Sequence, residues 1–112
     1  MLESKGTITM GSGKSAAGQI NLPPGTWIVI LHAHFETSVS SGYAEIWLDT
    51  TTGDPIQNWG AQGADCTSYP MPRLTMERIF CVTETTPVYG RYYQNSGSDR
   101  VVNYRIYAVR IK

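Results

Sequence analysis

Short apolar or alternating runs recur along the whole chain, and clusters of Gly, Pro, Asn, Asp and Ser separate them. Alternation with a period of two is typical of β-strands, whereas the helical spacing of three to four residues is almost absent. We predict strands near residues 6–10, 16–22, 26–37, 42–51, 73–84, 88–94 and 101–111. Residues 53–72 form the one long connection between them. The expected fold class is therefore all-β, with antiparallel strands in a sandwich or barrel.

Two of these strands carry apolar residues on both faces. In strand 26–37, one face holds Trp27, Val29 and Leu31, and the opposite face holds Ile28 and Ile30 before it turns polar. An antiparallel strand with one face in water should alternate cleanly instead. The last strand behaves similarly, with Val101, Tyr107, Val109 and Ile111 on one side and Val102, Tyr104, Ile106 and Ala108 on the other.

Something must cover the second apolar face of these strands. In a single domain of 112 residues, the simplest cover is another subunit. We therefore expect a homo-oligomer held by the strands that contain the pairs Ile28/Ile30 and Tyr104/Ile106, or by the opposite faces of those strands. An obligate interface of this kind should bury on the order of 2,000 Å² or more.

Charge and composition narrow the function classes. Nine basic and nine acidic residues give a formal net charge of zero with no basic stripe, which argues against a nucleic-acid partner. No apolar run approaches the roughly 20 residues of a membrane span, and residues 1–14 have no signal-peptide core. Either the protein acts in the cytoplasm or the chain is part of something longer. Cys66 and Cys81 are expected to be unpaired thiols, with a single disulfide as the alternative.

The order of the strands resembles a known family. The run LPPGTWIV at residues 22–29 is similar to the turn and strand that open phage tail-fibre tip domains, and the strands near 43–48, 74–83, 88–94 and 104–111 continue the likeness. These tips belong to the trimeric jelly rolls that resemble the tumour necrosis factor and complement globular-head superfamily. The resemblance implies a TNF-like antiparallel jelly roll over residues 16–112 that assembles as a homotrimer through the strands named above. Residues 1–15 would be a flexible or fibre-connecting entry segment that holds a short first strand. No functional residue is diagnostic in that family, so none carries over.

His32 and His34 are the candidate metal ligands. Residues i and i+2 of a strand point the same way, so the two imidazoles project side by side. One chain supplies two ligands and a three-fold axis would supply six, which resembles the iron sites that some phage fibres hold with H-x-H strands. The alternative is a pair of histidines bonded to neighbouring carboxylates or hydroxyls. No catalytic motif is present, and we expect no enzymatic activity.

The long connection is the best candidate for ligand recognition, because aromatic rings and amide or carboxylate groups together suit sugars. Its residues of these types are Gln57, Asn58, Trp59, Gln62, Asp65 and Tyr69, and a second cluster comprises Tyr92, Tyr93 and Asn95. The alternative is that Trp59 and Tyr69 only anchor the loop to the sandwich.

The resemblance and these clusters together predict a tail-fibre tip that is made in the host cytoplasm and displayed on the virion surface. Its partner would be a host-surface receptor, with carbohydrate as the expected ligand class. Two alternatives remain open, namely a structural trimerisation module without a ligand and a glycan-processing enzyme.

Overall fold

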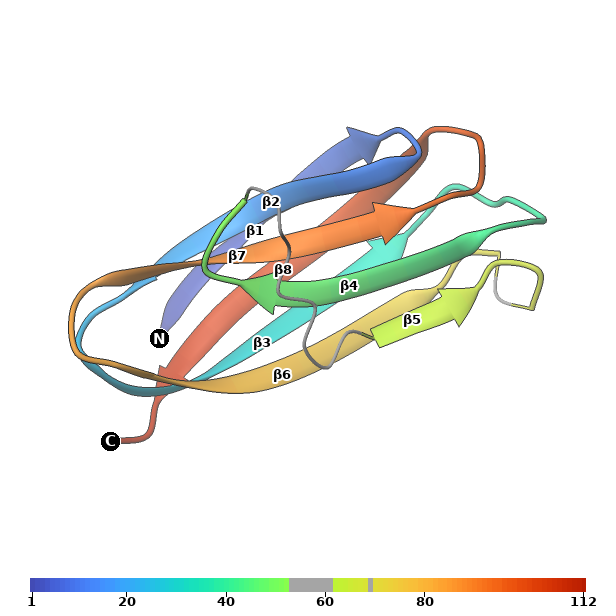
Figure 1. The fold of residues 1–112 in the computed structure, drawn as a ribbon. Coiled ribbons are helices and arrows are strands. Elements are labelled where there is room, and N and C mark those ends of the chain that lie inside the picture. The colour runs from blue at the N-terminus through green and yellow to red at the C-terminus, as the bar shows by residue number, and fades with distance from the viewer. Residues whose placement is uncertain (53–61, 69) are drawn as a thin grey trace.

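The computed structural model describes residues 1–52, 62–68 and 70–112, which contain eight strands and no helix. The strands are β1 (Leu2–Met10), β2 (Gly13–Leu22), β3 (Gly25–Phe35), β4 (Tyr43–Asp49), β5 (Gln62–Asp65), β6 (Arg73–Val82), β7 (Thr86–Gln94) and β8 (Arg100–Arg110). They form two layers, as Figure 1 shows. The prediction of an all-β chain is therefore confirmed.

Each layer is a four-stranded antiparallel sheet. Sheet A has the order β1-β8-β3-β6, and sheet B has the order β2-β7-β4-β5. The arrangement is that of a β-sandwich, with β1 and β6 at the edges of sheet A and β2 and β5 at the edges of sheet B.

The core lies between the two sheets and follows the alternation of the strands. In β3, the face predicted from Trp27, Val29 and Leu31 is buried along its length, and the face that begins with Ile28 and Ile30 is only half-buried. Sheet B contributes buried residues such as Ile46, Leu48 and Val88. Each large apolar side chain buried in this way contributes about 1.5–3 kcal/mol to stability, so packing between the sheets is the main force that holds them together.

Two strands differ from the sequence prediction. Strand β5 lies inside the segment 53–72 that was predicted to be a loop, and it pairs with β4 through residues 62–65. Strand β1 is longer than the predicted 6–10 and pairs with β8 along its whole length. Residues 2–10 therefore form an edge strand of sheet A, which is longer than the short first strand expected within residues 1–15.

A glycine sets the close approach of the two sheets near one edge. Gly18 has a φ of +82° and lies at a register irregularity in β2, between Ala17 and Gln19. A Cβ at this position would lie 2.7 Å from Cε1 of Tyr104 and 3.0 Å from Cγ2 of Ile106. The absence of a side chain at Gly18 therefore lets the Tyr104 ring pack under β2.

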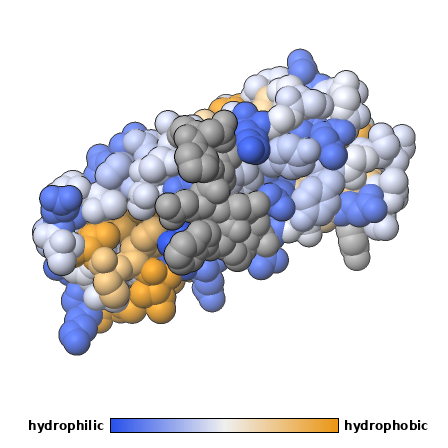
Figure 2. Space-filling view, viewed as in Figure 1, coloured by the Kyte–Doolittle hydropathy of each residue, from blue (hydrophilic) through white to orange (hydrophobic). Residues whose placement is uncertain are grey.

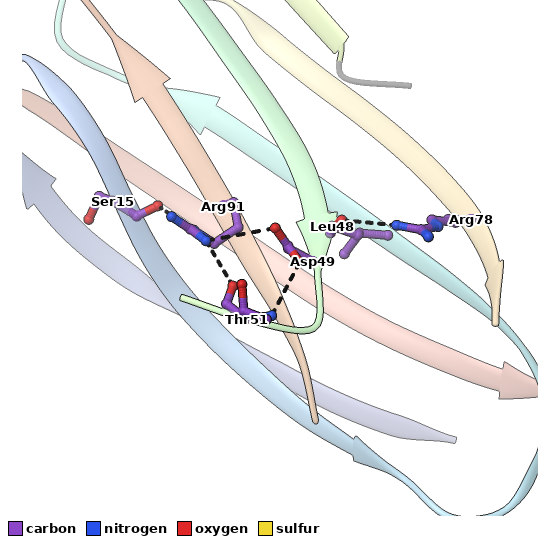
Figure 3. A network of polar contacts seen from close by, with 6 residues as sticks. All are labelled: Ser15, Leu48, Asp49, Thr51, Arg78 and Arg91. Atoms are coloured by element: carbon purple, nitrogen blue, oxygen red, sulfur yellow. Dashed lines mark hydrogen bonds and ion pairs between the residues drawn. The ribbon is translucent and has the colours of Figure 1, made fainter. Parts of the chain in front are cut away.

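Two buried arginines connect the strands. The Arg91 guanidinium donates to the carbonyl of Thr51 at 2.8 Å and to that of Ser15 at 3.5 Å, and lies 3.9 Å from the Asp49 carboxylate (Figure 3). The same network view shows Arg78 donating to the carbonyl of Leu48.

The second buried arginine is Arg100, which donates to the Cys66 sulfur at 3.2 Å and to the carbonyl of Pro70 at 2.8 Å. Cys66 is buried and Cys81 is exposed, and both are free thiols as predicted.

Candidate functional site

The outer face of sheet A is the surface that the sequence predicted to be covered by another subunit. Alternate residues of its four strands point outward there: Glu3, Lys5 and Thr7 of β1, Asn103, Arg105, Tyr107 and Val109 of β8, Ile28, Ile30, His32 and His34 of β3, and Arg73, Thr75, Glu77 and Ile79 of β6. The strand register divides this face into an apolar half and a polar half.

The apolar half, which we call the apolar patch, consists of Ile28, Ile30, Ile79, Tyr107 and Val109. Ile28 lies opposite Ile79 on one side and Val109 on the other, and Ile30 lies opposite Tyr107. Ile79 is 60% exposed and Val109 is 43% exposed. In the view of Figure 2, sheet B faces the reader, and apolar residues are visible at the end of the molecule where β6 ends. A contiguous exposed patch of this kind marks an interaction surface more often than a free one.

The four residues predicted at the trimer interface lie on two different faces. Ile28 and Ile30 belong to the apolar patch, whereas Ile106 is completely buried in the core. Tyr104 also faces inward, and its ring lies against Gly6 and Gly18. The four therefore cannot form one surface, because Tyr104 and Ile106 point from β8 toward the core, whereas Ile28 and Ile30 point outward from β3. The outward residues of β8 beside Ile28 and Ile30 are Tyr107 and Val109.

The polar half contains a depression of about 390 Å³, which we call the cationic depression. It is lined by three residues from each of three adjacent strands: His32, Ala33 and His34, Arg73, Leu74 and Thr75, and Asn103, Tyr104 and Arg105. None of these nine residues is acidic. In the register, His34 lies between Arg73 and Asn103, and His32 lies between Thr75 and Arg105.

His32 is bonded to neighbouring side chains. Its Nδ1 lies 2.8 Å from the Thr75 hydroxyl, its Nε2 lies 3.4 Å from the Tyr107 hydroxyl, and its ring stacks on that of Tyr107. This is the arrangement given above as the alternative to metal binding. No group of three metal-ligating side chains occurs within residues 1–52, 62–68 and 70–112, and the guanidinium groups of Arg73 and Arg105 stand beside the two histidines. Positive neighbours of this kind repel a metal cation, so a single chain does not favour metal binding here. Binding of iron or another transition metal by His32 and His34 of three chains around a three-fold axis stays a prediction.

The predicted ligand residues fall into three groups. Gln57, Asn58, Trp59 and Tyr69 lie outside the described residues. Tyr92 is buried in the core, where its hydroxyl donates to the carbonyl of Ala17 at 3.0 Å and burial strongly raises its pKa. The predicted Tyr92/Tyr93 pair is therefore wrong as a cluster, because successive residues of a strand point to opposite faces.

The third group of predicted residues, which includes Asp65, Tyr93 and Asn95, lies on the outer face of sheet B. Beside it lies Tyr43, which was not predicted. Tyr43 of β4 lies opposite Asp65 of β5, and Glu45 lies opposite Tyr93 of β7. The side chain of Asn95 accepts a hydrogen bond from the backbone N–H of Tyr43 at 2.6 Å. We call Tyr43, Glu45, Asp65 and Tyr93 the tyrosine cluster. Tyr43 was missed because it follows the pair Ser41–Gly42 and marks the start of a strand, a position that sequence patterns define poorly.

The tyrosine cluster combines an exposed ring with carboxylates. Tyr43 is 38% exposed, and its hydroxyl donates to Glu45 at 3.2 Å. Partial burial, and then the negative charge of Glu45, raise the pKa of Tyr43. The hydrogen bonds from the hydroxyl and then the backbone N–H of Thr67 lower the pKa of Asp65. At neutral pH this surface therefore offers a neutral phenol beside charged acceptors.

Within the described parts of the chain, no helix is long and apolar enough to cross a membrane. Comparison with known proteins finds no family model and no curated protein that matches this sequence.

Proposed function

We propose that this protein is a non-enzymatic, homotrimeric binding module, which forms the receptor-binding tip of a phage tail fibre or a similar adhesin. The observation that carries the proposal is the apolar patch on the outer face of sheet A, with Ile79 and Val109 largely exposed in the isolated chain. A surface of this kind needs a cover, and a second copy of the chain is the occupant we propose.

The strand pairing supports the jelly-roll form of the sandwich. Strand β1 pairs with β8, β2 with β7, β3 with β6 and β4 with β5. These are the pairs that result when one long antiparallel ribbon is rolled into two sheets, which is the plan of an eight-stranded jelly roll. The resemblance noted in the sequence implies this same fold and trimeric assembly.

A second apolar surface favours a ring over a two-fold dimer. The open edge of the sandwich between β5 and β6 has a hollow of about 430 Å³ that is lined by Ala64, Met71, Pro72, Arg73 and Leu74, and Met71 is 51% exposed. The apolar patch and this edge hollow are different surfaces of one molecule. When two different surfaces of identical chains bind each other, the contact is head-to-tail, and it closes into a ring if the rotation allows.

The tyrosine cluster is the surface that we propose for the receptor. It lies on the outer face of sheet B, so contacts through sheet A leave it open. A tyrosine ring can stack on the C–H face of a sugar while the carboxylates of Glu45 and Asp65 accept hydrogen bonds from hydroxyls. Three copies on one trimer would strengthen a weak single-site contact through avidity.

The assembly is tested by light scattering on Ile79→Lys, which alters the apolar patch, and Met71→Lys, which alters the edge hollow. Each variant alone should fail to form the trimer. A 1:1 mixture should form a dimer, because one intact pair of surfaces remains between the two variants. Gln19→Lys, an exposed change on sheet B, is the matched control and should stay trimeric. A wild-type protein that is monomeric at micromolar concentration would refute the proposal.

The receptor site is tested separately by glycan-array binding of the trimer. Tyr43→Ala should abolish array binding and leave the oligomer and the melting temperature unchanged. A trimer that binds no glycan and no host cell would instead support the structural-module alternative.

A further inference from the structure

The cationic depression on sheet A gathers positive charge in a chain whose net charge is zero. Arg73 and His34 are directly opposite each other on β6 and β3, and Arg105 and His32 are opposite each other on β8 and β3. Basic groups placed opposite each other repel when both are charged, and such pairs destabilise a sheet. An arrangement of this kind is stabilised when an anion binds between the groups.

One carboxylate pairs with part of this charge. The Arg105 guanidinium holds Glu3 of β1 through two nitrogens, each 2.7 Å from the same carboxylate oxygen. Lys5 lies opposite Arg105 on that side and adds another positive charge. The nearest acidic residue on β6 that faces outward is Glu77, which lies opposite Ile30 in the apolar half. Within the part of the chain that the structure describes, no acidic residue is paired with Arg73 or His34 in the register. Glu36, directly after the end of β3, is the exposed acidic residue next to this side in the chain.

Several side chains that line the depression carry hydrogen-bond donors. Asn103 accepts a hydrogen bond from Thr7 through Oδ1 at 2.5 Å, so its amide N–H groups are the part left for a ligand. A guanidinium offers a planar set of N–H donors that matches the geometry of an oxyanion. Arg73 and Asn103 stand on the two sides of His34, so all three can reach one small group.

We propose that the cationic depression is a binding site for a compact oxyanion, held by Arg73, His34 and Asn103 with Arg105 as a supporting charge. The volume of about 390 Å³ exceeds the roughly 30 Å³ that one water occupies, and so admits a phosphate or sulfate with its waters or the carboxylate end of an acidic sugar. This site is separate from the tyrosine cluster, which presents carboxylates and repels anions. The inference stands on the geometry of one chain and does not require the proposed trimer. Arg73 and Leu74 also line the edge hollow, so in that trimer the site would border the contact between subunits.

Isothermal titration calorimetry on the full chain, at low ionic strength with chloride as the balancing anion, tests the proposal. We expect phosphate and sulfate to bind with a dissociation constant on the order of 1 mM, which corresponds to about 4 kcal/mol. In a separate arm, a carboxylated monosaccharide is compared with its neutral counterpart. Binding of inorganic anions alone would identify a free oxyanion as the ligand, and tighter binding of the acidic sugar would identify a glycan carboxylate. Either result supports an oxyanion site.

Two variants and one control make the test specific. Arg73→Gln removes one charge-assisted donor, and Asn103→Asp keeps the acceptor for Thr7 while it places a negative charge in the depression. Each should weaken phosphate binding about tenfold or more. Lys14→Gln removes one positive charge from sheet B and should leave the affinity unchanged. The proposal is overturned if wild-type protein shows no binding of any oxyanion, or if all three variants weaken it equally, since that would mean a general charge effect.

Light scattering on the same samples separates this result from the proposed function. A trimer that binds no oxyanion would overturn the present inference alone. A monomer that binds phosphate, with loss in Arg73→Gln, would overturn the trimer and support the site. If oxyanion binding appears only after Ile79→Lys has separated the subunits, another copy fills the depression in the trimer, and the site is then overturned for the assembled protein.

Discussion

The close packing of Gly18 against Tyr104 leads to a prediction whose size follows from the structure. Gly18→Ala adds one methyl group in a backbone with a φ of +82°, where that group would lie 2.7 Å from the Tyr104 ring. A non-glycine residue in the left-handed region costs roughly 1–2 kcal/mol, and overpacking a core adds about 1–3 kcal/mol. We expect Gly18→Ala to lower the free energy of unfolding by about 2–5 kcal/mol.

Gly97 provides a matched control, because it has nearly the same backbone angle without the contact. Its φ is +81°, and nothing lies within 4 Å of a Cβ built on it. Gly97→Ala should therefore lose only the backbone contribution of roughly 1–2 kcal/mol. The difference between the two variants isolates the steric cost of the methyl group against Tyr104.

Urea unfolding followed by tryptophan fluorescence measures both variants at one fixed protein concentration, because assembly makes stability depend on concentration. A third variant, Tyr104→Val, removes the ring atoms in question. Gly18→Ala should cost less in that background than in the wild type. Equal losses for Gly18→Ala and Gly97→Ala would refute the reasoning, since they would mean that the ring moves aside at no cost.

Three further changes test the buried polar groups. Asp49→Ala should lower the free energy of unfolding, measured in urea, by about 3 kcal/mol, because it leaves the buried Arg91 guanidinium without its carboxylate. As a comparison, Glu3→Ala at the more exposed ion pair with Arg105 should lower it by at most about 1 kcal/mol. Similar losses for the two variants would show that the Arg91–Asp49 pair is not buried in solution. Tyr92→Phe should cost about 1 kcal/mol at pH 7. Because burial raises the pKa of Tyr92 above its ordinary 10.0, the wild type should lose stability as pH rises above 10 and Tyr92→Phe should lose less, and parallel pH profiles would contradict this. Arg100→Lys should lower the melting temperature, because an ammonium group cannot reproduce the planar contacts to Cys66 and Pro70, and an unchanged melting temperature would argue against those contacts.

The positions of most strands could be predicted from the sequence, because apolar and polar residues alternate along them. Which face of β3 and of β8 packs in the core could not be predicted, because both faces carry apolar residues and only the burial in the folded sandwich has a period of two. Strand β5 could not be predicted in this way. Its residues QGAD have low intrinsic strand preference, and the strand exists because β4 supplies its hydrogen-bonding partner.

The candidate sites were predicted less completely, because a site depends on which strands become neighbours. His32 and His34 were identified as a side-by-side pair from spacing alone. No residue spacing indicated that Arg73 and Asn103, which are far apart in the chain, would lie on either side of His34. Tyr92 was mistaken for a surface residue because aromatic residues suit both a core and a binding site. What distinguishes the two is the face of β7 on which each residue lies, since Tyr92 faces Tyr104 of sheet A and Tyr93 points the other way.

The place of β8 in sheet A has a consequence for how the protein is made. Strand β8 is translated after the other seven, yet it lies between β1 and β3 and separates them in the finished sheet. Until the residues of β8 have been synthesised, β1 and β3 each have an edge whose backbone hydrogen-bonding groups are unpaired. Strand β3 also carries apolar residues on both of its faces. Pairings between residues so distant in sequence form slowly, over milliseconds to seconds. The nascent chain therefore passes through an interval in which the edge of β3 is open to neighbouring chains, and crowded expression should favour aggregation before β8 has been made and paired.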